Sequence, residues 1–136
     1  MFGRFEHSLD VKGRVILPVK LRSHFPEKGF ITAYLEGCLA LWTPEEFNKK
    51  SLLMKEQENK SPQERMLARL FAADAYELEL DRQGRIAIPA RLRKYAKLEG
   101  DALIHGAFDR VEIWNPTIWE NLAAPAERLF IEGGIA

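Results

Sequence analysis

Two short segments of the chain alternate apolar residues with other residues, and each segment ends at a proline. Alternation with a period of two predicts a β-strand that buries one face. Pro18 and Pro89 end these strands and suit the first position of a short helix. The inward-facing positions are predicted to be Val15 and Leu17 in the first segment, and Ile86 and Ile88 in the second.

The two segments belong to an internal repeat with an offset of 71 residues. Both copies read Leu-Asp-x-x-Gly-Arg-[Val/Ile]-x-[Leu/Ile]-Pro-x-x-Leu-Arg, beginning at Leu9 and Leu80. Residues 10–13 and 81–84 are typical of type I β-turns, because Asp at the first position accepts bonds from turn amides and Gly tolerates the exit geometry. Each repeat is therefore predicted to contain two strands joined by a turn, a helix, two more strands and a second helix.

Capping residues predict where the helices begin and end. Thr43 and Asn115 are good N-caps for the second helix of each repeat. Left-handed caps are expected at Gly29 and Gly100, after the short helices. The polar segment between the repeats is predicted to be helical and to be interrupted at Ser61, which caps the helix that follows.

These signals divide the chain into four parts. The predicted parts are residues 1–50 as the first repeat, 51–75 as a helical connector, 76–122 as the second repeat, and 123–136 as a C-terminal tail. The tail is expected to be frayed after Pro125. The connector carries an apolar stripe that indicates a packing face, with either the chain itself or a neighbour as its partner: Met66, Leu67, Leu70 and Phe71.

Composition excludes several classes of protein. The single cysteine, Cys38, rules out a disulfide framework and a Cys-based zinc cluster, and we expect it to be buried. The three histidines share no metal-ligand spacing, and we interpret His7 and His105 as ordinary polar positions. No phosphate-binding loop or catalytic grouping is present, so we expect neither an enzyme nor a cofactor. No apolar run reaches the roughly 20 residues that span a bilayer, which favours a cytoplasmic protein.

Charge is segregated along a chain whose formal net charge is zero. Residues 10–22 and 81–94 hold nine of the 20 basic side chains but only two of the 20 acidic ones, and they sum to +7. The rest of the chain sums to −7. A concentrated basic surface of this kind is typical of nucleic-acid-binding proteins.

Basic residues in the two turns are the strongest candidates for contact with DNA. Arg suits bidentate recognition of guanine, while phosphate contacts supply most of the affinity. A purely structural interpretation remains open, in which Asp10 with Arg14 and Asp81 with Arg85 only form ion pairs that fix each turn. Basic residues on the short helices are weaker candidates, typical of solvated helix faces: Lys20, Arg22, Arg91 and Arg93. The three tryptophans are more typical of a core or a subunit interface than of base stacking: Trp42, Trp114 and Trp119.

The repeated motif resembles the MraZ family of bacterial transcriptional regulators, from Met1 to about Trp119. The resemblance implies an α+β fold of tandem SpoVT–AbrB repeats, in which two swapped-hairpin halves form a β-barrel core with a pseudo-twofold axis. It also implies a homo-oligomeric ring, associated with the nucleoid, that binds short direct repeats in its own promoter upstream of the division and cell wall genes. The DNA-binding residues it implies are Asp10, Lys12, Gly13, Arg14, Asp81, Arg82, Gly84 and Arg85.

The function expected from the sequence is a sequence-specific DNA-binding regulator, acting as a repressor through basic loops on an oligomer. Two alternatives stay open. One is an AbrB-like antitoxin that binds both DNA and a partner protein. Such proteins usually carry one repeat and a disordered tail, whereas this chain has two repeats. The other is a ring-forming scaffold that binds no nucleic acid.

Overall fold

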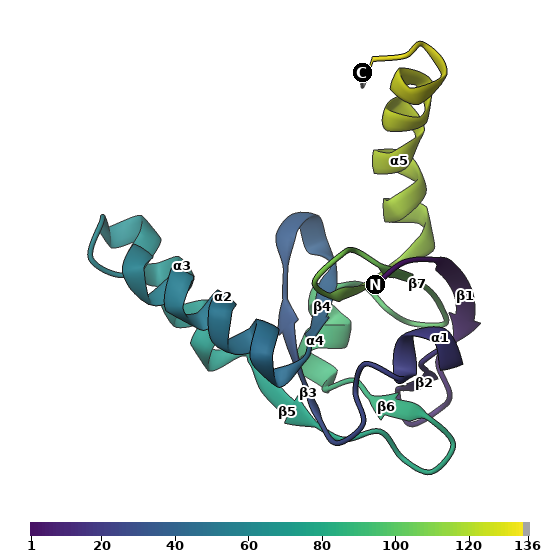
Figure 1. The fold of residues 1–136 in the computed structure, drawn as a ribbon, viewed down its shortest axis with the longest axis horizontal. Helices are drawn as coiled ribbons and strands as arrows, with labels where there is room; N and C mark the ends of the chain where they lie inside the picture. Colours follow the sequence, from purple (N-terminus) through teal and green to yellow (C-terminus); the bar gives the residue numbers. More distant parts are fainter. Residues whose placement is uncertain (135–136) are drawn as a thin grey trace.

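Each repeat folds in the order that its sequence predicts, in a computed structural model that describes residues 1–134 (Figure 1). The first repeat contains β1 (Arg4–Ser8), β2 (Arg14–Ile16), α1 (Val19–Arg22), β3 (Gly29–Ala33), the 3-10 turn η1 (Leu35–Gly37), β4 (Leu39–Trp42) and α2 (Pro44–Gln57). After α3 (Pro62–Ala73), the second contains β5 (Tyr76–Leu78), β6 (Arg85–Ala87), α4 (Ala90–Tyr95), β7 (Asp101–Gly106), β8 (Val111–Trp114) and α5 (Pro116–Ile131). Residues 1–134 therefore form a mixed α+β structure with five α-helices and antiparallel sheets.

Most strand pairings join the two repeats. A six-stranded sheet has the order β1-β7-β8-β4-β3-β5, and β2 and β6 form a separate two-stranded ribbon. Within residues 1–134, only β3–β4 and β7–β8 are pairings within one repeat, whereas β1–β7, β3–β5, β4–β8 and β2–β6 all connect one repeat to the other. Neither repeat therefore has a complete sheet of its own.

The core lies between the ribbon, the larger sheet and the two short helices. All four residues predicted to face inward from β2, β6 and the residues that follow them are buried, as are Leu21 on α1 and Leu92 on α4. Burying one such side chain contributes about 1.5–3 kcal/mol. Because these residues come from both repeats, one continuous core holds the halves together.

The predicted helix N-caps are confirmed. Thr43 Oγ1 accepts a hydrogen bond from the Glu46 amide at 3.2 Å, and Ser61 Oγ accepts one from the Glu64 amide at 3.1 Å. Asn115 Oδ1 accepts from the Thr117 amide at 2.8 Å and from the next amide at 3.1 Å. These side chains satisfy amides that have no partner inside the helix.

The predicted left-handed caps at Gly29 and Gly100 are wrong. Neither glycine has a positive φ, and the left-handed residue after α4 is Lys97, with a φ of 55°. The helices end earlier than the glycines suggest, since α1 stops at Arg22 and Gly29 already begins β3. Gly29 is instead a site of close packing, where an added Cβ would lie 3.0 Å from the Phe25 ring.

The prediction of a frayed tail after Pro125 is also wrong, because the residues up to Ile131 are helical. Helix α5 passes through Pro125 and ends at Ile131. Gly134 N–H donates to the Leu129 carbonyl oxygen at 2.7 Å, and the last two residues of the predicted tail, 135–136, lie outside the described residues.

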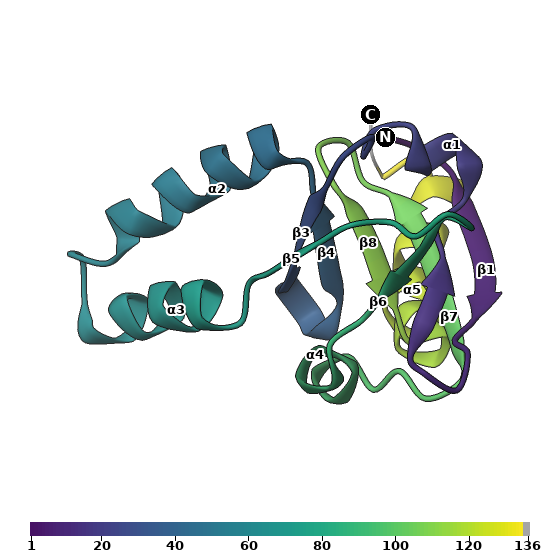
Figure 2. The same ribbon diagram turned by 90° about the horizontal axis from the view of Figure 1, so that it is seen from below.

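Two helical parts project from the sheets. The α2–α3 hairpin extends from one side (Figures 1 and 2), and α5 extends from another (Figure 1). No residue of α5 is fully buried. None of the helices within residues 1–134 has the length and hydropathy needed to cross a membrane.

Candidate nucleic-acid interface

The first basic turn is built around Asp10. Gly13 N–H donates to the Asp10 carbonyl oxygen at 3.0 Å, which closes the predicted turn. The carboxylate oxygen Oδ1 of Asp10 accepts hydrogen bonds from the Lys12 and Arg14 amides, both at 2.9 Å. Gly13 has a φ of 74°, a conformation that favours glycine.

The second turn repeats this geometry. Gly84 N–H donates to the Asp81 carbonyl oxygen at 2.9 Å, and Asp81 Oδ1 accepts from the Gln83 and Arg85 amides, both at 2.9 Å. The φ of Gly84 is 78°. Both predicted turns are therefore confirmed, and the same residue types stabilise each of them.

Each turn aspartate also holds an arginine side chain. The distance from Nε to Oδ2 is 2.7 Å in both Arg14–Asp10 and Arg85–Asp81. Hydrogen bonds from the backbone amide of Arg14 first, and from its side chain, hold the pKa of Asp10 below its ordinary value, and Arg85 does the same for Asp81.

The hydrogen bonds in these two ion pairs use the arginine Nε alone. Within residues 1–134, the terminal amino groups of Arg14 donate to no acceptor, and Arg85 Nη1 lies 3.8 Å from Asp10 Oδ2. A guanidinium fixed in this way can still donate through its terminal nitrogens, the geometry used with guanine or phosphate. The ion-pair interpretation and the DNA-binding interpretation are therefore compatible.

A second pair of arginines covers the turn glycines of the opposite repeat. Arg22 Nε and Nη2 donate to the Leu17 carbonyl oxygen at 3.1 and 2.9 Å, which places the guanidinium over Gly84. Arg93 Nε donates to the Ile88 carbonyl oxygen at 3.0 Å, and its guanidinium lies over Gly13. The prediction that Arg22 and Arg93 belong to solvated helix faces is wrong, because both lock a turn in place.

The β2–β6 ribbon sets the positions of the two turns. Arg14 pairs with Ala87 and Ile16 pairs with Arg85, so both arginines lie on the outer face while Val15 is buried beneath. One turn lies at each end of the ribbon, since Leu17 N–H donates to the Gly84 carbonyl oxygen and Ile88 N–H to that of Gly13. Three residue pairs span about 10 Å.

The turn tips differ chemically although their backbones match. The first tip carries Val11 and Lys12, and the second carries Arg82 and Gln83. All four side chains are exposed. In contrast, the candidate contact residues Gly13 and Gly84 are buried beneath the arginines of the opposite repeat.

Two of the three tryptophans and the cysteine are buried. Trp42 and Trp114 are buried, as predicted for core residues, and Trp42 Nε1 donates to Thr32 Oγ1 at 3.0 Å. Cys38 is also buried as predicted, and burial raises the pKa of its thiol well above the ordinary value.

A buried polar cluster at the base of α5 is not predicted by any pattern in the sequence. His105 Nε2 lies 3.1 Å from Glu112 Oε1, and Arg110 Nη2 lies 2.8 Å from Glu112 Oε2. The interpretation of His105 as an ordinary polar position is wrong, because Glu112 is its carboxylate partner. Glu112 lies opposite His105 in the register of β7 and β8. The sequence does not reveal this pairing, because the two residues are seven positions apart.

This cluster positions the start of α5. Trp114 Nε1 donates to Glu112 Oε1 at 3.0 Å, and the Trp119 ring packs against His105 with centroids 4.6 Å apart. Burial alone would raise the pKa of Glu112, but bonds from His105 and Arg110 outweigh it and hold that pKa below its ordinary value. Within residues 1–134, no three His, Cys, Asp or Glu residues are grouped as metal ligands.

Comparison with known proteins agrees with the repeat. Residues 1–70 and 71–132 each match the family described as "MraZ protein, putative antitoxin-like". A protein of Thermoanaerobacter sp. strain X514 is 39% identical over 132 residues, which cover 97% of this chain and 92% of that protein. Proteins of Acetivibrio thermocellus and Symbiobacterium thermophilum are 41% and 40% identical, over 88% and 96% of this chain and 84% and 94% of their own lengths. All three are named "Transcriptional regulator MraZ", and the chain belongs to the MraZ family.

Proposed function

We propose that this protein is a sequence-specific DNA-binding transcriptional regulator that represses the bacterial division and cell wall gene cluster. It would bind short direct repeats in its own promoter through the two basic turns, displayed on a ring of identical subunits. The observation that carries the proposal is the placement of both Asp-x-x-Gly-Arg turns at the ends of one exposed ribbon. Cytoplasmic location and association with the nucleoid follow from this function.

The ribbon suits double-stranded DNA in size and charge. The major groove is about 12 Å wide and admits a two-stranded β-ribbon. Arg14 and Arg85 would donate their terminal amino groups to base edges or phosphates, while Asp10 and Asp81 hold the guanidinium planes. Gly13 and Gly84 would act through the turn conformation, because both are buried.

The differences between the tips support unequal contacts by the two repeats. The Lys12 ammonium is a compact point charge that only donates hydrogen bonds, and this suits contact with phosphate. Arg82 and Gln83 match the hydrogen-bonding edges of guanine and adenine, and the exposed methyl groups of Val11 suit the thymine methyl group. We therefore propose that each turn reads a different part of the operator.

We further propose that the fold is a tandem SpoVT–AbrB arrangement with swapped hairpins and a pseudo-twofold axis. Supporting this, β2 pairs with β6 and each turn glycine is covered by an arginine of the other repeat. The boundaries proposed for the repeats remain residues 1–50 and 76–122, joined by the connector 51–75.

Footprinting of the purified protein on its own upstream region tests the function. The expected result is protection of short, regularly spaced direct repeats at concentrations that leave random DNA unprotected. Absence of protection at concentrations where the protein is folded and assembled would contradict the proposal.

The antitoxin alternative is supported by the words of the family description, "antitoxin-like". It adds a partner protein to the same DNA-binding face. Co-expression with the genes adjacent to this one, followed by purification, separates the two. A stoichiometric second protein whose activity this chain inhibits would favour the antitoxin.

A further inference from the structure

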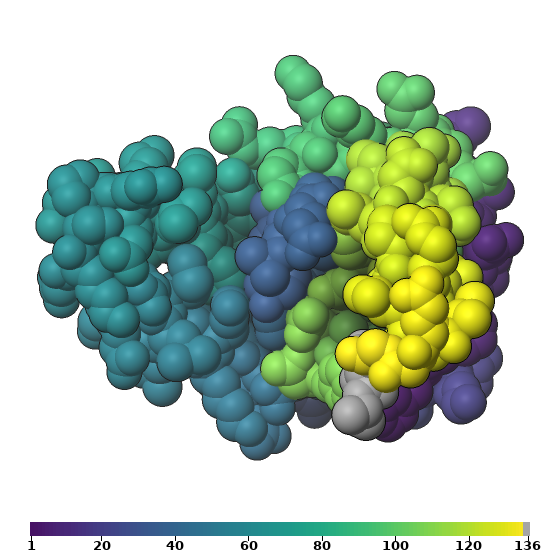
Figure 3. All heavy atoms as spheres, turned by 90° about the horizontal axis from the view of Figure 1, so that it is seen from above, coloured from purple at the N-terminus to yellow at the C-terminus, as the bar shows by residue number. Residues whose placement is uncertain are grey.

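Helix α5 is held to the rest of the protein near its base. Ile118 and Trp119 pack against a small buried cluster that includes Trp114 of β8. From Pro125 to Gly134 every residue is exposed. Figure 3 shows the helix on the outside of the molecule, away from the α2–α3 hairpin. The contacts of its first turns therefore set the direction of the whole helix.

The Trp119 ring contacts two groups that carry or can carry a positive charge. Its centroid lies 4.6 Å from that of His105 on β7, whose side chain is only 13% exposed. The guanidinium carbon of Arg4, which is opposite His105 in the β1–β7 register, lies 5.4 Å from the same indole ring. Trp119 Nε1 is buried and has no acceptor within residues 1–134. An unpaired buried donor opposes this packing, so the ring contacts have to outweigh its cost.

Both nitrogens of the His105 ring face oxygen acceptors. Nδ1 lies 3.0 Å from the Gly106 carbonyl oxygen, and Nε2 lies 3.1 Å from Glu112 Oε1. A carbonyl or carboxylate oxygen only accepts, so both contacts are hydrogen bonds only when both ring nitrogens carry a proton. This part of the geometry matches the positively charged imidazolium.

The neutral ring also has a partner at Nε2. Trp114 Nε1 lies 3.1 Å from His105 Nε2 and 3.0 Å from Glu112 Oε1. An indole N–H only donates, so it bonds to Nε2 only when that nitrogen has lost its proton. Nε2 therefore has an acceptor for the charged state and a donor for the neutral state. Histidine is the side chain that ordinarily changes charge between about pH 5 and 8.

We propose that His105 is a pH-sensitive switch that sets how firmly the base of α5 is held to the sheet. In the charged state Nε2 donates to Glu112, and the imidazolium attracts the face of the Trp119 ring. When the proton leaves to solvent, the Trp114 N–H turns from Glu112 to Nε2, and that attraction is lost. Trp119 keeps its unpaired N–H but has weaker contacts, so the base of α5 loosens as pH rises.

The charged groups around the ring keep both states accessible. Glu112 favours the charged ring, whereas the guanidinium of Arg4 and that of Arg110 oppose it. Because these charges act in opposite directions, neither state is excluded by its surroundings.

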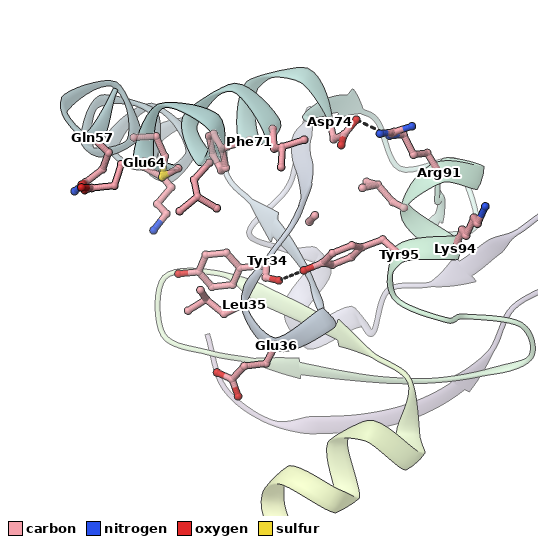
Figure 4. Close-up of a pocket in the computed structure, with 16 residues that line it drawn as sticks. Tyr34, Leu35, Glu36, Gln57, Glu64, Phe71, Asp74, Arg91, Lys94 and Tyr95 are labelled. Atoms are coloured by element: carbon pink, nitrogen blue, oxygen red, sulfur yellow. Dashed lines mark hydrogen bonds and ion pairs between the residues drawn. The ribbon is translucent and has the colours of Figure 1, made fainter. Parts of the chain in front are cut away.

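Arg110 confines the change to the histidine side of the carboxylate. It bonds to Glu112 Oε2 through Nε at 2.9 Å and Nη2 at 2.8 Å. Asp109 Oδ1, 2.9 Å from Nη1, and the Tyr34 ring, 4.9 Å from the guanidinium carbon, fix it from other directions. Tyr34 lines the apolar groove between the α2–α3 hairpin and α4 (Figure 4). Glu112 therefore keeps Arg110 as its partner in both states of the switch.

Nuclear magnetic resonance of the indole N–H groups follows the switch in the unmodified protein. The Nε1–H signals of Trp114 and Trp119 should shift together with the ring signals of His105 in one transition. Trp42 is the internal control, because its N–H donates to Thr32 in the core and its signal should not follow that transition. A titration of His105 that leaves the other two signals unchanged would overturn the proposal. So would a His105 ring that does not titrate between about pH 5 and 8.

Hydrogen exchange measures the effect on α5 itself. Protection of the amides in residues 116–123, corrected for the intrinsic effect of pH, should fall about two- to fivefold from pH 5 to pH 8, as expected for one lost cation–ring contact. His105→Gln still forms hydrogen bonds but cannot become charged, so its protection should not depend on pH. His24→Gln, at an exposed position, is the matched control and should behave like the unmodified protein.

Two results of the exchange experiment would contradict the switch. One is equal protection of α5 at both pH values in the unmodified protein, and the other is an unchanged pH dependence in His105→Gln that circular dichroism shows to be folded. Neither measurement uses DNA, so the outcome is independent of the function proposed for the basic turns.

Discussion

Individual side chains explain how two short turns keep a fixed shape on the surface. Arg22 and Arg93 each donate to a backbone carbonyl oxygen of their own repeat and cover a glycine of the other. A Cβ at either Gly13 or Gly84 would overlap the covering guanidinium. The turns are therefore coupled across the repeats. Local sequence patterns did not predict this, because the contact joins residues about 60 to 80 positions apart.

Removal of one covering arginine should destabilise the fold. In Arg22→Ala the Leu17 carbonyl oxygen loses two charged donors, and such bonds contribute about 1.5–3 kcal/mol. We expect the free energy of unfolding in urea to fall by roughly that amount, with little recovery in Arg22→Lys, because lysine lacks the planar fork. Lys20→Ala, on the exposed side of α1, should change it by less than about 0.5 kcal/mol. Equal stabilities for Arg22→Ala and Lys20→Ala would show that the cover has no structural role.

The lowered pKa values of the turn aspartates lead to a prediction about how stability depends on pH. Because the pKa of Asp81 is lowered in the folded protein, its contribution to stability is present above the ordinary value of 3.8 and is lost as pH falls through the lowered value. The largest cause is the backbone amide of Arg85, which Arg85→Ala retains. An NMR titration of the Asp81 carboxyl should therefore give a midpoint below 3.8 in the unmodified protein, and a higher one, still below 3.8, in Arg85→Ala. A midpoint at or above 3.8 in the unmodified protein would contradict the observed hydrogen bonding.

The secondary-structure elements agree with the sequence prediction where neighbouring residues alone determine them. Thr43, Ser61 and Asn115 cap the helices as predicted, because a cap depends on a few neighbouring residues. The error at Gly29 arises because the chain has already entered β3 at that residue. The continuation of α5 through Pro125 has no explanation in local propensity, since proline is the least favourable residue in a helix interior. The His105–Glu112 pair was missed because it depends on strand register, which periodicity does not supply.

The β7–β8 hairpin offers a test of that pair. Glu112→Ala removes the carboxylate that His105 and Arg110 share, although Arg110 keeps its ion pair with Asp109 at 2.9 Å. Leaving buried hydrogen-bonding groups without a partner costs about 1–3 kcal/mol, and we expect the free energy of unfolding to fall by about that amount. Glu99→Ala, at an exposed position, is the control and should be nearly neutral. A neutral Glu112→Ala would mean that the cluster does not hold the hairpin.

The molecule as a whole combines a shared core with two projecting helical surfaces. The repeat predicted the order of the elements in both halves, and its charge pattern marked residues 10–22 and 81–94 as basic. Which strands pair across the halves could not be predicted from periodicity, because pairing partners are chosen by long-range packing. The apolar groove between the α2–α3 hairpin and α4 was not predicted for the same reason, although the connector stripe indicated one of its walls.

The salt dependence of DNA binding tests whether the paired turns contact nucleic acid. If the oligomer neutralises roughly 6–10 phosphates, affinity for the upstream region should fall by about 10³–10⁵ between 50 and 200 mM salt. The same titration of the Arg14→Ala, Arg85→Ala double variant should give weaker binding, by about 1–3 kcal/mol for each lost base contact. Its salt slope should be shallower if the arginines also touch phosphate. A flat salt response in the unmodified protein, or unchanged affinity in a folded double variant, would contradict the assignment of the turns to DNA.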